Sequence, residues 1–158
     1  MGLKNSLQKF LLKRPFKKKT EKEKLLSARV SKIIGQNVKN LDYYQEAFSL
    51  KIPNKTTGAK NYERLEFLGD AVLGSIISCY LYKNYPVANE GFLTQMKSKI
   101  VNRKNLNSLG EKLKLRDFIQ NGGNGNLGEN ISGNLFEAFI GALYLDTNYE
   151  TCEKIVLE

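Results

Sequence analysis

The sequence has 158 residues, of which 41% are hydrophobic, so it is long enough for one domain with its own core. It contains no histidine, which excludes the commonest general base and leaves carboxylates, lysines, tyrosines or a hard metal ion for any catalysis. No apolar run approaches a membrane span, so we expect a soluble protein without a membrane partner. Cys79 and Cys152 lie in apolar surroundings typical of buried thiols, which indicates a reducing, cytoplasmic location.

The first predicted segment is a basic arm at residues 1–24. It holds nine Lys or Arg against two Glu, a net charge of +7, which leaves only +2 of the total +9 for the other residues. Such an excess indicates a polyanionic partner, with nucleic acid ahead of a membrane surface. A solvated tail that aids solubility is the alternative interpretation.

Helical periodicity continues through the rest of the chain and predicts an all-α fold. No alternating pattern typical of a β-strand appears. The predicted elements are helices over 24–35, 41–50, 62–84, 90–101, 104–113 and 134–146, a further helix from about Tyr149, and loops over 51–60 and 121–133.

The start of the longest predicted helix, "NYERLEFLGDAV", carries three acids inside an apolar run. Glu63, Glu66 and Asp70 stand at helical positions i, i+3 and i+7, within about 60° of one face. Apolar residues of the same helix continue on or beside this arc. Three like charges repel one another, and an apolar surface adds a desolvation cost. A helix that packs well therefore needs something to compensate these charges.

The helix "NLFEAFIGALYLD" repeats this arrangement. Asn134 and Glu137 share a face with Ala138 and Gly141, whose small side chains allow a second helix to approach closely. Two such helices offset the cost of their polar clusters if they face each other around a cation. Oxygen donors at these spacings suit a hard divalent ion such as Mg²⁺ or Mn²⁺.

Each cluster also has a simpler interpretation. Glu63 and Glu66 could be first-turn acids that the helix dipole favours, although Asp70 lies too deep in the helix for this effect. Asn134 followed three residues later by Glu137 is also the pattern of a capping box. Spacing alone leaves these alternatives open.

The motifs resemble those of a known family. "ERLEFLGDAVL" resembles the signature helix of the ribonuclease III family, and "NLFEAFIGALYLD" resembles its second acidic motif. "NEG" at 89–91 and "KSKIVNRKNL" at 97–106 fall where the family has intervening acidic and basic segments. The resemblance covers about residues 27–157. It implies an all-α homodimer that cleaves double-stranded RNA with Mg²⁺, for which Mn²⁺ can substitute, and leaves 5′-phosphate and 3′-hydroxyl ends, in rRNA or mRNA processing.

The resemblance also implies roles for individual residues. It assigns metal binding to Glu66, Asp70, Asn134 and Glu137, and catalytic roles to Asp70, Glu137, Glu63 and Glu90, with Glu63 at the edge of the site and Glu90 linked to turnover. Phe67 and Leu68 become candidates for the dimer interface. Asn134 stands where the family usually has Asp, and its neutral oxygen should bind a metal more weakly.

The expected organisation is a flexible basic arm at 1–24 and a catalytic domain at 25–158. Bacterial-type members usually append a double-stranded-RNA-binding domain, and we expect none within this sequence, which ends at Glu158. A catalytically lapsed relative that only binds double-stranded RNA is the contrasting function, and Asn134 is the feature that favours it. A plain helical interaction module would leave both carboxylate clusters unexplained.

Overall fold

The computed structural model describes residues 19–50, 61–120 and 127–158, and its regular elements are all helical, which confirms the all-α prediction. Most of the predicted elements are confirmed, whereas the loop predicted at 51–60 and most of the arm lie outside the described residues. The elements are α2 (Glu21–Ile34), α3 (Leu41–Ala47), α4 (Tyr62–Asn84), α5 (Glu90–Ile100), α6 (Arg103–Lys112), the 3-10 helix η1 (Leu115–Phe118), α7 (Ile131–Asp146) and α8 (Tyr149–Leu157).

Helix α2 begins three residues before its predicted start because Thr20 caps it. The Thr20 hydroxyl accepts a hydrogen bond from the Glu23 backbone N–H at 3.2 Å, and the Glu23 carboxylate accepts one from the Thr20 N–H at 2.7 Å. This reciprocal capping box satisfies two N–H groups of the first turn. Gly35 ends the helix in the left-handed conformation, at φ 69°. Residues 21–24, which were expected in the arm, are therefore helical.

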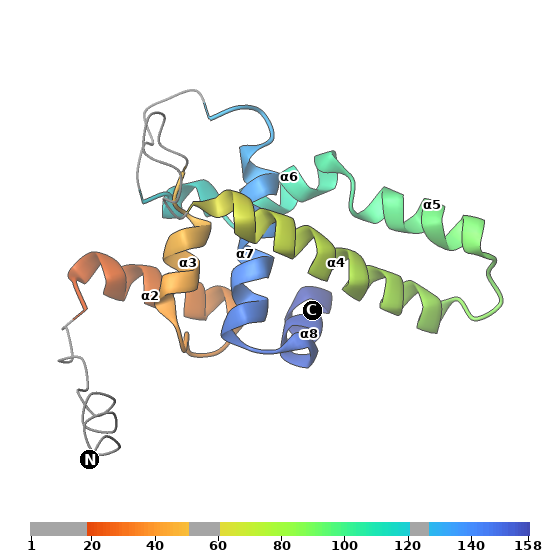
Figure 1. Cartoon of the computed structure of the whole chain (residues 1–158), viewed down its shortest axis with the longest axis horizontal. Helices are drawn as coiled ribbons and strands as arrows, with labels where there is room; N and C mark the ends of the chain where they lie inside the picture. Colours follow the sequence, from red (N-terminus) through yellow and green to blue (C-terminus); the bar gives the residue numbers. More distant parts are fainter. Residues whose placement is uncertain (1–18, 51–60, 121–126) are drawn as a thin grey trace, which may run out of the picture.

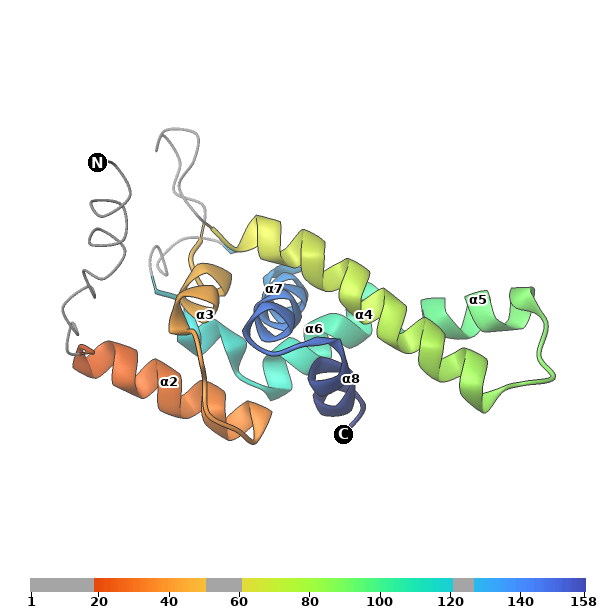
Figure 2. The ribbon, with the colours of Figure 1, turned by 60° about the horizontal axis from the view of Figure 1, so that its bottom comes forward.

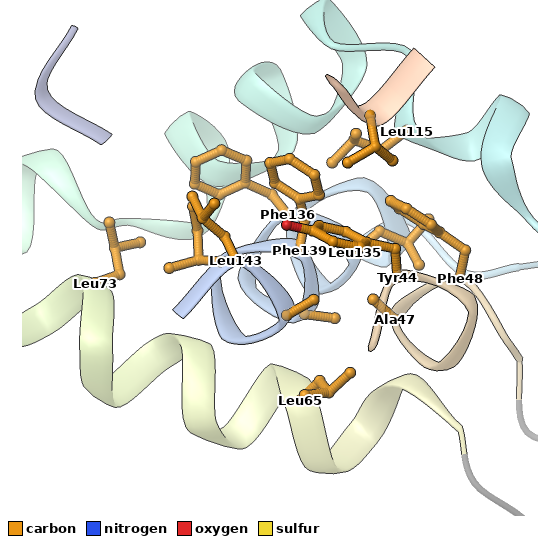
Figure 3. Packing of buried hydrophobic residues seen from close by; sticks show 14 of the residues in the cluster. Tyr44, Ala47, Phe48, Leu65, Leu73, Leu115, Leu135, Phe136, Phe139 and Leu143 are labelled. Carbon is orange, nitrogen blue, oxygen red and sulfur yellow. The ribbon is translucent and has the colours of Figure 1, made fainter. Parts of the chain in front are cut away.

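Helix α7 forms the centre of the domain. Figure 2 shows it nearly end-on, with α3 and α4 on either side of it and α6 close by. Thirteen of its sixteen residues are buried, so almost every face of this helix meets another element. Around it, α3 contributes Tyr44 and Ala47, Phe48 packs directly after the end of α3, and the first half of α4 contributes Leu65 (Figure 3). The core is thus a shell of helices around one apolar helix.

Glycine allows α4 and α7 to cross in contact. A Cβ atom on Gly69 of α4 would overlap the backbone carbonyl of Glu137 on α7, and one on Gly141 of α7 would overlap the carbonyl of Leu65 on α4. The two backbones touch here without intervening side chains. The prediction that small residues on α7 admit a second helix is confirmed, and the partner helix is α4.

A buried carboxylate at the end of α7 holds the α2–α3 connection in place. Asp146 accepts hydrogen bonds from the backbone N–H of Asn40 at 2.6 Å, the N–H of Lys39 at 3.2 Å and the Tyr44 hydroxyl at 3.1 Å. Burial raises the pKa of Tyr44 well above its ordinary value, and the charge of Asp146 and its hydrogen bond add to this effect. The role of this aspartate was not predicted from the sequence.

Helices α4 and α5 form a long antiparallel hairpin that projects from the rest of the domain (Figure 1). In the described part of the chain, α4 is the one helix long and apolar enough to cross a bilayer, judged by length and composition alone. The expectation that no segment approaches the length and apolar character of a membrane span was therefore wrong for α4. Part of α4 packs against α7, and one helix of this composition is weak evidence for a membrane span, because packed helices of globular domains pass the same test.

Candidate metal centre

The crossing of α4 and α7 brings the two polar clusters together. Glu66 and Asp70 stand one turn apart on α4, on either side of Gly69, whose Cα faces the backbone carbonyl of Glu137. Asn134 lies one turn before Glu137 on α7. The same glycine contact that packs the helices therefore places the acids of α4 beside those of α7, as the spacing of the motifs predicts.

The four carboxylates differ in burial, which the helical wheel could not show. Glu63 and Asp70 are exposed and Glu66 is half-buried, so the acids of α4 lie along the rim of the helix interface and not inside it. Glu137 is 4% exposed and is the one acid carried into the interface. The desolvation cost that was predicted for the acids of α4 therefore applies mainly to Glu137 on α7.

Asn134 is not a helix cap. Helix α7 begins at Ile131 with Asn130 at the N-cap, three residues earlier than predicted, so Asn134 lies within the helix and the capping-box alternative is wrong. The capping bond comes from another helix instead. The side-chain oxygen of Asn107 on α6 accepts a hydrogen bond from the Gly133 N–H at 2.8 Å. The Asn134 side chain is therefore available to the acidic cluster.

Arg103, the first residue of α6, reaches this cluster. Its Nη1 donates a hydrogen bond to the Asn134 Oδ1 at 2.7 Å and contacts the Glu137 Oε2 at 3.4 Å. In the sequence, only the basic segment that contains Arg103 stands out, and not this residue itself. Its signal was faint: it stands one turn before Asn107, so both polar residues occupy the face of α6 that meets the start of α7.

Electrostatic interactions link these side chains. Burial raises the pKa of Glu137, Arg103 opposes this shift, and the charges of Asp70 and Glu66 add to it. Burial also raises the pKa of Glu66, again opposed by Arg103, while Glu63 and Asp70 raise it further. Glu137 is repelled by acids on the facing helix α4, and Glu66 is repelled by acids on its own helix. Glu63 therefore interacts with the cluster from its edge.

Glu90 lies apart from the cluster in the single chain. It begins α5 at the outer end of the hairpin, whereas Glu66 and Asp70 lie in the first half of α4 (Figure 1). Its Oε1 accepts a hydrogen bond from the Thr94 hydroxyl at 2.6 Å. Glu90 is not among the charges that shift the pKa values of Glu66 and Glu137. Its link to turnover stays a prediction.

The donor set suits a hard divalent cation chemically. Three carboxylates and one amide, from Glu66, Asp70, Glu137 and Asn134, offer only oxygen atoms, which is the ligand type that Mg²⁺ and Mn²⁺ prefer. Within residues 19–50, 61–120 and 127–158, no three acidic side chains already converge at metal-binding geometry. Two of the four donors, Asn134 and Glu137, contact the Arg103 guanidinium instead. A positively charged group therefore already lies at the candidate site.

Comparisons with known proteins find relatives of this chain. A family model described as "Ribonuclease III domain" matches residues 63–148. The chain is 44% identical over 142 residues to Ribonuclease 3 of Flavobacterium psychrophilum, covering 87% of this chain and 58% of that protein. It is 48% identical over 129 residues to Ribonuclease 3 of Zunongwangia profunda, covering 79% and 53%. The chain thus spans little more than half the length of these two relatives.

Solved structures show the same fold. The nuclease domain of ribonuclease III from Campylobacter jejuni, in a structure describing flexibility in the region involved in dimer formation, matches with a TM-score of 0.71 and 28% identity, over 82% of this chain and 92% of that chain. Dicer from Pichia stipitis matches with a TM-score of 0.53 and 29% identity, over 68% of this chain and 46% of that one.

Proposed function

The chain belongs to the ribonuclease III family, and from this premise we propose that it is an endonuclease domain that hydrolyses double-stranded RNA with the help of Mg²⁺ or Mn²⁺. The observation that carries the proposal is the crossing at Gly69, where the acids of two motifs meet across one helix contact. Products with 5′-phosphate and 3′-hydroxyl ends, a role in rRNA or mRNA processing and a cytoplasmic location belong to the same proposal.

In this proposal, Glu66, Asp70, Asn134 and Glu137 hold the ion. When bound, the ion supplies Lewis-acid stabilisation of the negative charge that develops at the phosphate. The chain's own contribution is position: Gly69 fixes the distance between the helices, and burial keeps Glu137 in one orientation. Glu66 and Glu137, whose raised pKa values reflect burial and repulsion, bind protons more readily than ordinary glutamates when no metal is present.

Positive charge near the acids supports a polyanionic substrate. Arg103 contacts Asn134 and Glu137, and the Lys97 Nζ lies beside Gly74, about one turn after Asp70 on α4. Phosphates of a duplex would be attracted to such cations while the acids hold the metal ion. The basic arm would add further contacts, but residues 1–18 lie outside the described part of the chain.

The proposal is tested by incubating the purified chain with long double-stranded RNA in Mg²⁺ and, separately, in Mn²⁺. We expect cleavage of the duplex and none of a single-stranded RNA of the same sequence. Mn²⁺ should support a faster reaction at low metal concentration because it binds such ligands more tightly. Binding of duplex RNA without cleavage in either metal would instead identify the lapsed RNA-binding relative, which the neutral Asn134 favours.

An apolar groove beside the acids supports the proposed homodimer. Phe67 on α4 is 81% exposed, which is unusual for a phenylalanine in a monomer. The groove around it is lined by five residues with apolar surface, namely Tyr43, Leu65, Phe67, Leu68 and Leu145, and by the charged residues Glu46, Glu63 and Arg64. Cutting both strands of a duplex requires two sites, and a two-fold dimer supplies them. We therefore propose that a second copy of this chain covers the groove.

Replacing Phe67 with Ser should shift the chain from dimer to monomer in sedimentation equilibrium at micromolar concentration. A two-fold interface loses the phenylalanine twice, so we expect dimerisation to weaken by about a hundredfold or more. Val87→Ser is the matched control, because Val87 is 99% exposed near the opposite end of α4 and should leave the association unchanged. If both variants associate as the wild type does, the groove around Phe67 is not the interface.

A further inference from the structure

The contact between Arg103 and the acidic cluster joins a surface residue to a buried one. The Arg103 side chain is 46% exposed, whereas that of Glu137 is 6% exposed, and the two meet at 3.4 Å. The same nitrogen makes its shorter bond, 2.7 Å, to the Asn134 oxygen. The guanidinium is therefore bound to two of the four proposed metal donors, the two that come from α7.

The packing of α6 on α7 directs Arg103 to this position. A Cβ atom on Gly110 of α6 would overlap the Ser132 carbonyl, so these two backbones also touch. Asn107, one turn before Gly110 on α6, accepts a hydrogen bond from the Gly133 N–H. A Cβ atom on Gly133 would lie 3.3 Å from the Arg103 Nη1, so the glycine leaves room for the guanidinium. Arg103 is thus held at the start of α7 by the fold.

The charges explain why a cation is held there. Asp70, Glu66 and Glu137 repel one another, and Asn134 adds an oxygen without adding a fourth negative charge. A guanidinium placed between the two donors of α7 compensates part of this repulsion. A divalent ion would need the same two oxygen atoms, and it would be repelled by a cation that remained a few ångströms away.

We propose that Arg103 is a built-in cation of this centre that competes with the divalent ion. It binds the Asn134 and Glu137 oxygens when no ion is present, and it leaves them when an ion binds. The identity of residue 103 then sets how tightly the domain holds its metal. This inference rests on the proposed metal site at these residues, and it concerns the affinity of that site.

The competition is measured without RNA, by isothermal titration of the metal-free chain with MnCl₂. Arg103→Gln keeps an amide donor but removes the charge, and it should tighten Mn²⁺ binding by about tenfold. Lys104→Gln removes the same charge from an exposed neighbouring residue and should change binding by less than about twofold. Arg103→Lys keeps the charge without the forked guanidinium and should fall between wild type and Arg103→Gln.

Metal-free stability gives a second readout. Without Arg103, the buried Glu137 loses its ionic partner, so metal-free Arg103→Gln should melt below Lys104→Gln at neutral pH. Saturating Mn²⁺ should raise its melting temperature by more than it raises that of the wild type. If Arg103 were an ordinary surface cation, its replacement would change neither the metal-free melting temperature nor the increase caused by Mn²⁺.

The outcomes separate the inference from the proposed function. If the wild type binds Mn²⁺ and Glu137→Gln does not, but Arg103→Gln binds no more tightly than Lys104→Gln, the metal site stands and the competition is wrong. If neither the wild type nor Arg103→Gln binds Mn²⁺, both proposals fail. If Arg103→Gln binds Mn²⁺ where the wild type shows no binding, the competition is supported in its strongest form.

Discussion

Glu137→Gln should lower the rate of duplex RNA cleavage by at least about a thousandfold while the domain stays folded. Glu137 is the acid buried at the helix crossing, and glutamine has nearly its shape, so the substitution removes the charge without opening a cavity. Asp70→Asn should have a similar effect from the facing helix. The measurement is single-turnover cleavage at saturating metal, with circular dichroism to show that each variant is folded.

Glu111→Gln is the control for this experiment, because Glu111 is an exposed acid on α6 and the variant should keep the wild-type rate.

The pH dependence of stability gives an independent check on Glu137. The raised pKa of Glu137 means that the folded state binds more protons than the unfolded state above the ordinary value of 4.5. Metal-free stability should therefore fall as pH rises through this window, and fall less in Glu137→Gln. In the cleavage experiment, a Glu137→Gln variant that retains a tenth of the wild-type cleavage rate would rule out an essential role for Glu137.

Gly69→Ala should destabilise the domain by about 3 kcal/mol, because the new methyl group meets backbone and not a movable side chain. The Cβ would overlap the Glu137 carbonyl and would also lie 2.9 Å from the Gly141 nitrogen. Helices α4 and α7 must then move apart, and the acids on them move too. We expect a lower midpoint in urea denaturation together with weaker Mn²⁺ binding.

Gly74→Ala, one and a half turns along α4, is the matched control. Its Cβ would lie 3.3 Å from the Lys97 Nζ, the far end of a flexible side chain that can shift. Alanine is the better helix former, so this variant should be more stable than wild type by about 0.5–1 kcal/mol. If the two alanine variants have the same denaturation midpoint, the close crossing at Gly69 does not hold the helices together.

Helix positions were largely predictable from the sequence because their signals are local. The bounds of α4 were predicted to the residue, since Asn61 caps its start and Pro86 follows closely after its end. The start of α7 was placed three residues too late. Its first N–H groups are satisfied partly by Asn107 on another helix, and a cap supplied across the fold leaves no local pattern.

The candidate site was predictable in part for the same reason. Acids spaced along two apolar helices indicated that the helices face each other, and the structure brings them together at Gly69. Their unequal burial was not predictable, because it depends on the angle at which α4 crosses α7. Arg103 was not predictable either. Its role arises from where α6 begins, and its spacing of one turn from Asn107 is a faint signal that Lys104, three residues before the same asparagine, shares.

The anchoring of the α2–α3 connection by Asp146 bears on how the chain folds as it is synthesised. The hydrogen bond from Lys39 to Asp146 joins residues that are 107 positions apart. Helices α2 and α3 leave the ribosome long before the aspartate that fixes them and the α7 side chains that complete their core. They cannot reach a stable native arrangement until α7 has emerged. We therefore expect the apolar faces of the early helices to stay exposed during synthesis and the domain to fold cooperatively once α7 has emerged.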